Sequence, residues 1–246
     1  MFCSLKMANK SLYFILILCS NYILSQESTE SKFWSSASYK YQSSEKLSFS
    51  ISQLYRVKDD LKAVDSYISE ISSDYVISKD LNFEIELRYY SKNDNKGSVQ
   101  GFENLWRYRL ALEKELKLKP LKIYLRFAFQ RRSSLDRDNS FKEYIRARSA
   151  LEYSIKNWDW DPYFYLEIIN KTSGNSLQKI RYGFGSSNKV KGSKWTIRYF
   201  YQVNKTIPKE NYHVMMLKYR YKQKSKKLKK IKEQKQQKRI NQKNQK

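Results

Sequence analysis

Side chains alternate between apolar and polar along most of this 246-residue chain. The clearest example is residues 81–89, LNFEIELRY, and the same pattern recurs over residues 102–116, 121–130 and 195–203. Successive side chains of an extended strand point to opposite faces, so a period of two places each kind of side chain on its own face. No long segment shows a helical period. The chain is therefore predicted to be all-β.

Polar connections separate the strand segments, and short connections alternate with longer ones. Short turns at one end and longer loops at the other are typical of an up-and-down transmembrane barrel. Single-chain bacterial barrels normally have an even number of strands. We therefore expect a single antiparallel barrel over residues 33–221 with about 12 strands, or alternatively 10. The eleven recognisable candidates are 33–42, 46–56, 66–77, 81–92, 102–116, 121–132, 141–155, 161–170, 176–186, 193–204 and 210–222.

Alternation alone does not show which face of a strand is buried. A soluble barrel turns its apolar face inward, whereas a barrel in a membrane turns it toward lipid. The apolar faces here carry Tyr and Trp near strand ends, as expected of aromatic girdles at a lipid–water interface. The polar faces carry both signs of charge, which favours pairing in an enclosed space. The expected girdle residues are Trp34, Tyr89, Trp106, Trp158, Trp160, Trp195, Tyr219 and Tyr221.

The N-terminal segment has the layout of a secretory signal peptide. Lys6 and Lys10 precede the apolar run 12–18, which is shorter than the roughly 20 residues that a membrane-spanning helix requires. We expect cleavage after Ser25, which leaves residues 26–32 as a short segment before the barrel. An uncleaved anchor and lipid attachment at Cys19 are the alternatives. Export favours a location in the outer membrane of a Gram-negative cell.

The C-terminal residues 222–246 are rich in lysine and form a predicted disordered tail. They contain 12 Lys and Arg residues and one acidic residue, Glu233, within a chain whose formal net charge is +25. Basic residues are attracted to anionic surfaces by about 1 kcal/mol each near a membrane. In the periplasm, such a tail would contact anionic cell-wall polymer or phospholipid headgroups.

Five stretches of the chain resemble a known family. They are FWSSASYKY (33–41), QLYRVKDD (53–60), YIRARSALEYSI (144–155), DPYFYLEII (161–169) and KIRYGFGSSNKVKGSKWTIRYFYQV (179–203). These stretches are similar to domain-of-unknown-function family 2490, exported barrels found mainly in Gram-negative Bacteroidota. The resemblance covers residues 33–221 and implies an outer-membrane barrel with no assigned activity. Its partners would be outer-membrane lipid, lipopolysaccharide and the barrel-assembly machinery.

The polar strand faces are predicted to line the barrel lumen. In a barrel of 10 to 12 strands the lumen is narrow, and charged side chains in it must pair or bind water. One interpretation is an Arg/Glu lattice that fills and stiffens the barrel. The other is a narrow path that favours anions, because arginines are in surplus. The charged residues expected in the lumen are Glu84, Glu86, Arg88, Arg107, Arg109, Glu113, Lys122, Arg126, Arg146, Arg148, Glu152, Glu167, Arg181, Arg198, Lys218 and Arg220.

Other function classes receive little support from the sequence. The single histidine, His213, has no GxSxG sequence and no acidic motif near it, so we do not expect an enzyme. Both cysteines lie in the first 20 residues, which removes cysteine-based zinc sites from the main body. We expect no cofactor, metal or nucleic acid. A basic, strand-rich protein that binds nucleic acid or other polyanions is the alternative, although it would not explain the signal peptide.

Overall fold

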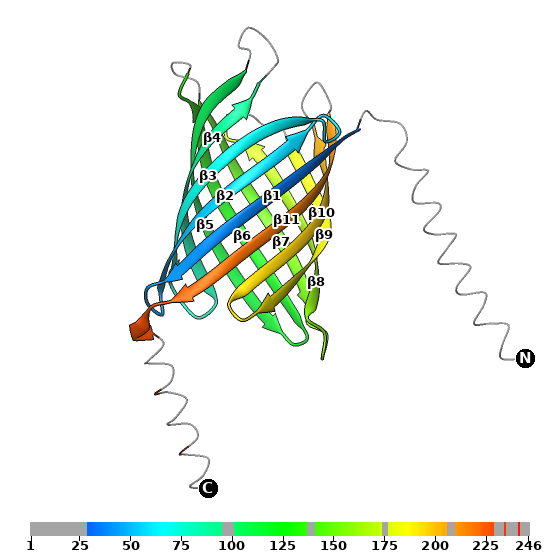
Figure 1. Ribbon diagram of the computed structural model, residues 1–246. Helices are drawn as coiled ribbons and strands as arrows, with labels where there is room; N and C mark the ends of the chain where they lie inside the picture. Colours follow the sequence, from blue (N-terminus) through cyan, green and yellow to red (C-terminus); the bar gives the residue numbers. More distant parts are fainter. Residues whose placement is uncertain are drawn as a thin grey trace, which may run out of the picture.

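A computed structural model describes residues 29–94, 101–136, 141–173, 177–205 and 210–228, together with residues 234 and 241. Within these ranges the chain forms eleven strands that close into one barrel (Figure 1). The expected signal peptide, residues 1–25, lies outside the described residues. The strands are β1 (Thr29–Gln42), β2 (Leu47–Lys58), β3 (Ala63–Val76), β4 (Leu81–Asn93), β5 (Phe102–Leu118), β6 (Leu121–Ser134), β7 (Phe141–Tyr153), β8 (Trp160–Lys171), β9 (Leu177–Val190), β10 (Ser193–Asn204) and β11 (Asn211–Lys224).

The number of strands differs from the expected 12 or 10. Each of the eleven sequence candidates corresponds to one strand, and each consecutive pair of strands is antiparallel. The barrel closes through β1 and β11, which pair in parallel from Thr29 beside Asn211 to Gln42 beside Lys224. An odd number of alternating strands leaves the first and last running in the same direction, so only a parallel pair closes the barrel. The expectation of an even number was wrong because it assumes antiparallel closure.

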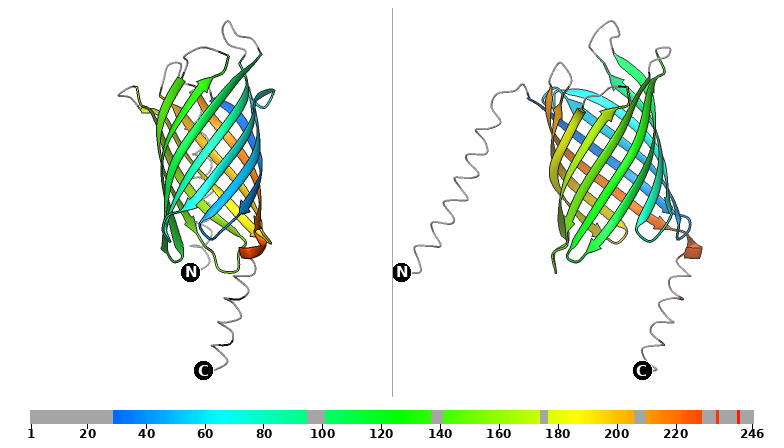
Figure 2. Two further views of the ribbon diagram at one scale, coloured as in Figure 1. Left: turned by 90° about the vertical axis from the view of Figure 1, so that its left-hand side faces the viewer. Right: turned by 180° about the vertical axis from the view of Figure 1, so that it is seen from behind.

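Parallel closure also places the start of β1 and the end of β11 at opposite ends of the barrel (Figure 2). We call these the upper and lower ends, as they are drawn in Figure 1. The connections at the lower end are 43–46, 77–80, 119–120, 154–159 and 191–192. Those at the upper end are 59–62, 94–101, 135–140, 172–176 and 205–210, so the shortest turns lie at the lower end.

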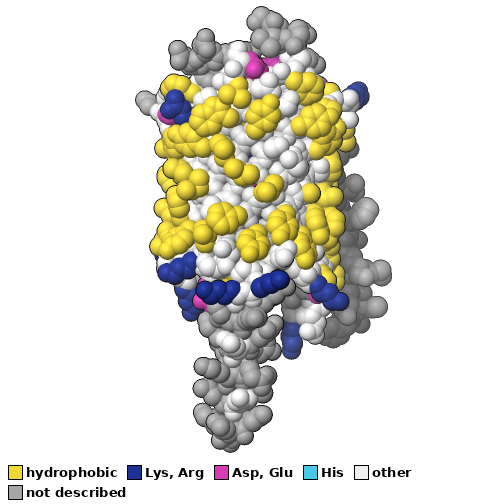
Figure 3. All heavy atoms as spheres, turned by 60° about the vertical axis from the view of Figure 1, so that its left-hand side comes forward, with side chains coloured by type: hydrophobic (Ala, Val, Ile, Leu, Met, Phe, Trp, Pro, Cys, Tyr) yellow, Lys and Arg dark blue, Asp and Glu magenta, His cyan; other side chains and the backbone are white. Residues whose placement is uncertain are grey.

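The apolar face of each strand forms the outside of the barrel. In β4, Ile85 and Leu87 are 48% and 44% exposed, whereas Glu86 between them is 1% exposed. Figure 3 shows hydrophobic side chains over the wall, with Lys and Arg gathered along the lower edge. A soluble barrel has the opposite arrangement, with its apolar side chains packed inside. The strands therefore have the arrangement of faces that is typical of a membrane barrel, with the apolar face outside and the charged face inside.

Charge on the outer wall is confined to the ends of strands. Among the described strand positions that face outward, the charged side chains are Lys114 toward the lower end of β5, and Arg131 and Glu143 at the upper ends of β6 and β7. Arg131 and Glu143 pair with each other across 3.7 Å. The middle of the outer wall is thus an uncharged band.

The barrel extends beyond the expected boundaries at both termini. β1 begins at Thr29, so part of the short segment expected before the barrel is strand. β11 ends at Lys224, and a helical turn follows at residues 226–228, whose Leu228 is buried. The Ser225 N–H donates to the Gln42 carbonyl oxygen at 3.0 Å, and its hydroxyl donates to the Ser43 carbonyl oxygen at 2.9 Å. These contacts anchor the first residues of the expected tail to the lower end.

Most of the remaining tail lies outside the described residues. No helix in the described part of the chain is long and apolar enough to cross a membrane.

Gly183 in β9 leaves a gap in the inner wall that aromatic rings fill. It lies between Tyr165 of β8 and Phe200 of β10, whose rings meet edge to face with centroids 6.2 Å apart. A Cβ atom at Gly183 would lie 2.2 Å from the carbonyl oxygen of Tyr199 and 2.6 Å from the Cα atom of Phe200. Neither backbone atom can move away without disturbing the pairing of β9 with β10. Glycine is therefore required at this position.

Replacing Gly183 with alanine is expected to lower the free energy of unfolding by about 1–3 kcal/mol, because the added methyl group overpacks the inner wall. Urea titration in detergent micelles measures this change. The control is Ser187→Ala in the same strand, because the buried Ser187 hydroxyl has no hydrogen-bond partner among the described residues. We expect Ser187→Ala to leave the transition midpoint unchanged. A stable Gly183→Ala variant would contradict the close packing at this point.

Candidate functional site

The barrel encloses a polar cavity of about 870 Å³. Its lining includes side chains from all eleven strands, from Lys32 and Lys92 near the upper end to Lys194 and Lys222 near the lower end. The lining contains 19 Lys and Arg residues and nine Asp and Glu residues. The cavity therefore extends along the barrel with an excess of positive charge.

The charged residues expected in the lumen lie on the inner wall. Fifteen of the sixteen line the cavity: Glu84, Glu86, Arg88, Arg107, Arg109, Glu113, Arg126, Arg146, Arg148, Glu152, Glu167, Arg181, Arg198, Lys218 and Arg220. The sixteenth, Lys122, lies lower on β6 and donates to Glu152 at 2.8 Å. Alternation in the strands explains this placement, because each of these residues lies on the polar face of its strand.

Glu86 is the centre of the largest ion-pair network. Its carboxylate contacts the guanidinium groups of Arg88, Arg107 and Arg109. Strand register brings these groups together, because Glu86 is opposite Arg109 and Arg88 is opposite Arg107 in the pairing of β4 with β5. Glu70 of β3 contacts Arg88 from the other side. Three arginines therefore share one buried carboxylate.

Glu84 connects this network to β6. Arg109 donates to the Glu84 carboxylate at 2.7 Å, and Arg126 contacts the same Oε1 atom at 2.7 Å. Arg126 also lies 3.7 Å from Glu113, which is the most exposed carboxylate of the group. The network thus crosses four neighbouring strands, β3 to β6, and each of its carboxylates contacts at least one arginine.

A second, smaller network surrounds Glu167 on β8. Arg146 donates to one oxygen of the Glu167 carboxylate at 2.7 Å, and Arg181 donates to the other at 3.3 Å. Arg146 also donates to Gln130 at 3.0 Å, and Arg181 to Gln202 at 2.7 Å. Each arginine therefore has one charged and one neutral partner. The two networks stiffen the wall from β3 to β10.

Other interior arginines lie against aromatic rings. Arg148 and Arg198 lie 4.9 and 4.6 Å from the centre of the Tyr165 ring, and Arg198 donates to the Tyr163 hydroxyl at 2.6 Å. A ring attracts a cation through its negative face without neutralising the charge. These arginines therefore keep a full positive charge inside the barrel.

Trp34 does not belong to the aromatic girdle. Its side chain points into the barrel, where Arg56 lies 4.0 Å from its ring centre and Phe200 packs against its edge at 5.3 Å. The alternation of β1 explains this, because Trp34 shares a face with Ser36, Ser38 and Lys40, whereas Phe33 lies on the opposite face. The expectation that Trp34 belongs to the girdle was wrong, because the alternation of β1, and not the nearness of Trp34 to a strand end, determines where its side chain points.

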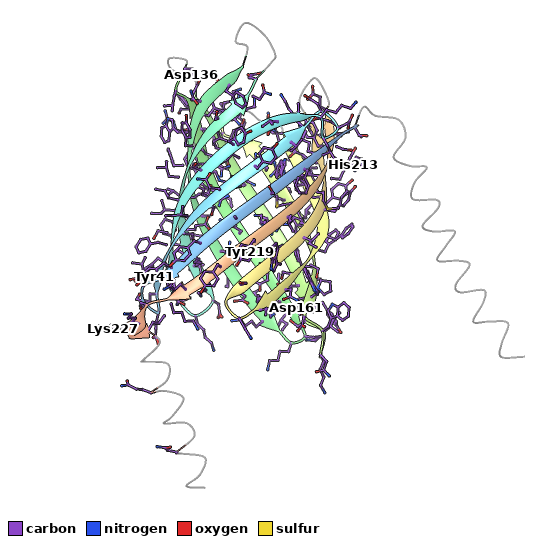
Figure 4. All side chains as sticks on the ribbon, in the orientation of Figure 1. Tyr41, Asp136, Asp161, His213, Tyr219 and Lys227 are labelled. Carbon is purple, nitrogen blue, oxygen red and sulfur yellow. The ribbon has the colours of Figure 1, made fainter. Side chains whose placement is uncertain are left out.

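The other expected girdle residues do not point into the lumen. Tyr89, Trp106, Trp160, Trp195, Tyr219 and Tyr221 lie on outward-facing positions, and the exposed Trp158 lies in the connection between β7 and β8. Trp195 and Tyr219 lie side by side near the lower end, with ring centroids 4.7 Å apart. Sequence reasoning missed Tyr39 and Tyr41, which are also exposed there, and Tyr41 is labelled near the lower end in Figure 4.

His213 lies near the upper end of β11 on the outer wall (Figure 4). Its Nδ1 atom hydrogen bonds with the Tyr199 hydroxyl at 2.6 Å, and the Tyr201 ring lies 4.9 Å away. These neighbours are aromatic and not acidic, so this environment resembles an aromatic girdle. The described residues hold no group of three or more His, Cys, Asp and Glu side chains placed to bind a metal ion.

Sequence reasoning also missed the serines of the inner wall. Ser36 and Ser38 of β1, Ser50 and Ser52 of β2 and Ser72 of β3 all line the cavity. The segment SFSIS over residues 48–52 contains the relevant alternation, with serine on one face and apolar side chains on the other. Because serine carries no charge, the charged positions alone did not indicate this face.

The fold and its interior define a closed β-barrel with an apolar outer wall and a charged, partly ion-paired cavity. The model of the family described as "Protein of unknown function (DUF2490)" matches residues 31–231, and the chain belongs to that family. The family resemblance identified from the sequence is thus confirmed. A comparison with curated proteins finds none that matches.

Proposed function

We propose that this protein is an outer-membrane β-barrel whose interior forms a narrow passage that favours anions. The exposed outer wall carries the first part of this proposal. Monomeric soluble proteins rarely expose a continuous apolar patch larger than a few hundred Å². A band of exposed Ile, Leu and Phe side chains around a barrel needs an apolar solvent, which the lipid bilayer supplies.

The length of the strands supports the same conclusion. A tilted strand needs about 9–11 residues to cross the hydrocarbon core of a bilayer. The strands contain 12 to 17 residues, so each can cross and extend into the interface at both ends. Exposed Tyr and Trp side chains near the lower end are suited to that interface.

The excess of basic residues in the cavity lining carries the second part of the proposal. Charge lining a narrow space raises the local concentration of ions of opposite sign. Rings of Arg and Lys favour anions in known pores. Because 19 basic residues face nine acidic ones, the cavity should attract anions and repel cations.

A closed structural barrel is the second candidate. The networks around Glu86 and Glu167 fill much of the space on the side of β3 to β8 and hold large side chains across it. Passage would then be limited to the side of β1 and β2, where serines replace several of the larger side chains. Conductance distinguishes a blocked barrel from an open one.

The lengths of the turns support one orientation of the barrel in the membrane. The shortest turns of outer-membrane barrels face the periplasm, so we propose that the lower end lies on that side. The lysine-rich C-terminal segment follows β11 at this end and would contact anionic cell-wall polymer or phospholipid headgroups in the periplasm. The outer membrane, lipopolysaccharide and the barrel-assembly machinery are the other partners of this proposal.

In a planar bilayer with a KCl gradient, the purified protein is expected to conduct with a chloride permeability above that of potassium. Replacing Arg148 and Lys179 together with glutamate should shift the reversal potential toward potassium, because both line the cavity and neither forms an ion pair among the described residues. Lys62→Glu in the exposed turn between β2 and β3 is the control, and it should leave selectivity unchanged.

Three outcomes would contradict parts of this proposal. A purified barrel that never conducts would support the closed structural barrel. Cation selectivity of the unaltered protein would overturn the preference for anions. A membrane barrel should be recovered in carbonate-washed outer membrane and should show heat-modifiable gel mobility. Recovery of the protein in solution without detergent would overturn the membrane location.

A further inference from the structure

The inner wall has two chemically different parts. From β4 to β8 it carries long Arg and Glu side chains that pair with one another. From β1 to β3 it carries the short side chains of Ser36, Ser38, Ser50, Ser52 and Ser72. The hydroxyl groups of these serines have no hydrogen-bond partner among the described residues. This part of the wall therefore has both free space and free hydrogen-bonding groups.

Four cations lie on the two strands that follow the serine-bearing wall around the barrel, two on β11 directly beside β1 and two on β10 behind them. Lys194, Arg198, Lys218 and Arg220 line the cavity, and none of them forms an ion pair within the described part of the chain. The parallel pairing of β1 with β11 places Ser36 beside Lys218 and Ser38 beside Arg220, and Lys194 is opposite Arg220. We call these four cations and the five serines the serine–cation surface.

The charges around Lys218 are poorly balanced. The charged groups that act on it most strongly are Arg198, Arg220, Arg88 and Glu70. The Glu70 carboxylate already contacts the Arg88 guanidinium. Like charges held together in a confined space are unfavourable without a counter-charge. Glu70 lies opposite Ser52, but its carboxylate is engaged by Arg88, so the four cations of the serine–cation surface have no ion-pair partner among the described residues.

We propose that the serine–cation surface binds a solute that carries a phosphate group. Ammonium and guanidinium groups pair strongly with phosphate oxygens, and hydroxyls donate to the remaining oxygens. A phosphate ester offers about two negative charges and several acceptor oxygens to one small site. The short serines leave room for the rest of the solute. This proposal rests on the proposed passage only in that the solute must enter the cavity.

Binding of inorganic pyrophosphate by the full chain in detergent tests this site. Isothermal titration calorimetry is expected to show saturable binding that weakens at least tenfold in Lys218→Met and in Arg220→Gln. The control is Lys62→Met, which removes the same charge from the exposed turn between β2 and β3, outside the cavity lining. We expect its affinity to stay within twofold of the unaltered protein.

The double variant Ser36→Ala, Ser38→Ala separates specific binding from general attraction. It keeps every charge, and we expect it to weaken binding severalfold by removing two donors. Heat-modifiable gel mobility establishes that each variant is folded. Because alanine is smaller than serine and carries no charge, this variant tests the site even where a lysine variant fails to fold.

Each outcome has a definite meaning for the two proposals. Anion-selective conductance without saturable binding would overturn the phosphate site and leave the passage. An equal loss of affinity in Lys62→Met, or no loss in the serine variant, would also overturn the site. Saturable binding that depends on Lys218 and the serines, in a barrel that does not conduct, would support the site and overturn the passage.

Discussion

Replacing Glu86 with glutamine is expected to lower the free energy of unfolding by about 3–5 kcal/mol. Glu86 is 1% exposed and its carboxylate contacts Arg88, Arg107 and Arg109. Glutamine keeps the size of the side chain but removes the charge that balances these guanidinium groups. Breaking a buried pair in this way is costly because the remaining charge stays buried without compensation.

Urea or guanidinium titration of the barrel in detergent micelles, followed by tryptophan fluorescence, measures this loss. Glu113→Gln is the matched control. Its carboxylate is 3.7 Å from Arg126 and its side chain is 39% exposed, so we expect a loss below about 1 kcal/mol. Equal effects of the two substitutions would show that the Glu86 network does not support the barrel.

Replacing Phe127 with arginine is expected to destabilise the barrel in a bilayer by about 2–4 kcal/mol. Phe127 lies in the middle of β6 on the outer wall and is 56% exposed. In a membrane this position faces hydrocarbon, where a guanidinium loses its hydration. In water the same substitution would be harmless, because an exposed arginine is well solvated. The experiment therefore tests which solvent surrounds the outer wall.

Leu61→Arg is the control for this experiment. Leu61 is also 56% exposed, but it lies in the turn between β2 and β3. We expect its stability to change by no more than about 0.5 kcal/mol. Folding into lipid vesicles at a series of urea concentrations compares the two variants. If Phe127→Arg is as stable as Leu61→Arg, the outer wall faces water and the membrane proposal fails.

The positions of the strands were predictable because they depend on local sequence. Each of the eleven candidates corresponds to one strand, with ends that shift by a few residues. The expected number of 12 or 10 strands was wrong, because closure depends on residues 29–42 meeting residues 211–224, and no local pattern predicts that pairing. The eleven candidates recognised directly in the sequence gave the correct number, whereas the general rule of an even number did not apply.

The interior residues were predictable to the extent that they carry charge. Trp34 lies on a polar face but was wrongly expected in the aromatic girdle, whereas the Arg and Glu positions followed from alternation. Their partners did not follow, because Glu167 of β8 meets Arg146 of β7 and Arg181 of β9 only after strand register is set. The serine–cation surface was missed for the same reason, since β1 and β11 are neighbours only in the closed barrel.

The amino-acid sequence determined which side chains share a face, because an extended backbone turns successive residues to opposite sides wherever the strand lies. Only the tertiary structure decided that the charged face is enclosed and the apolar face is exposed, that β1 pairs in parallel with β11, and which carboxylate meets which arginine. These features depend on contacts between residues far apart in the chain, and the sheet creates those contacts only when it closes.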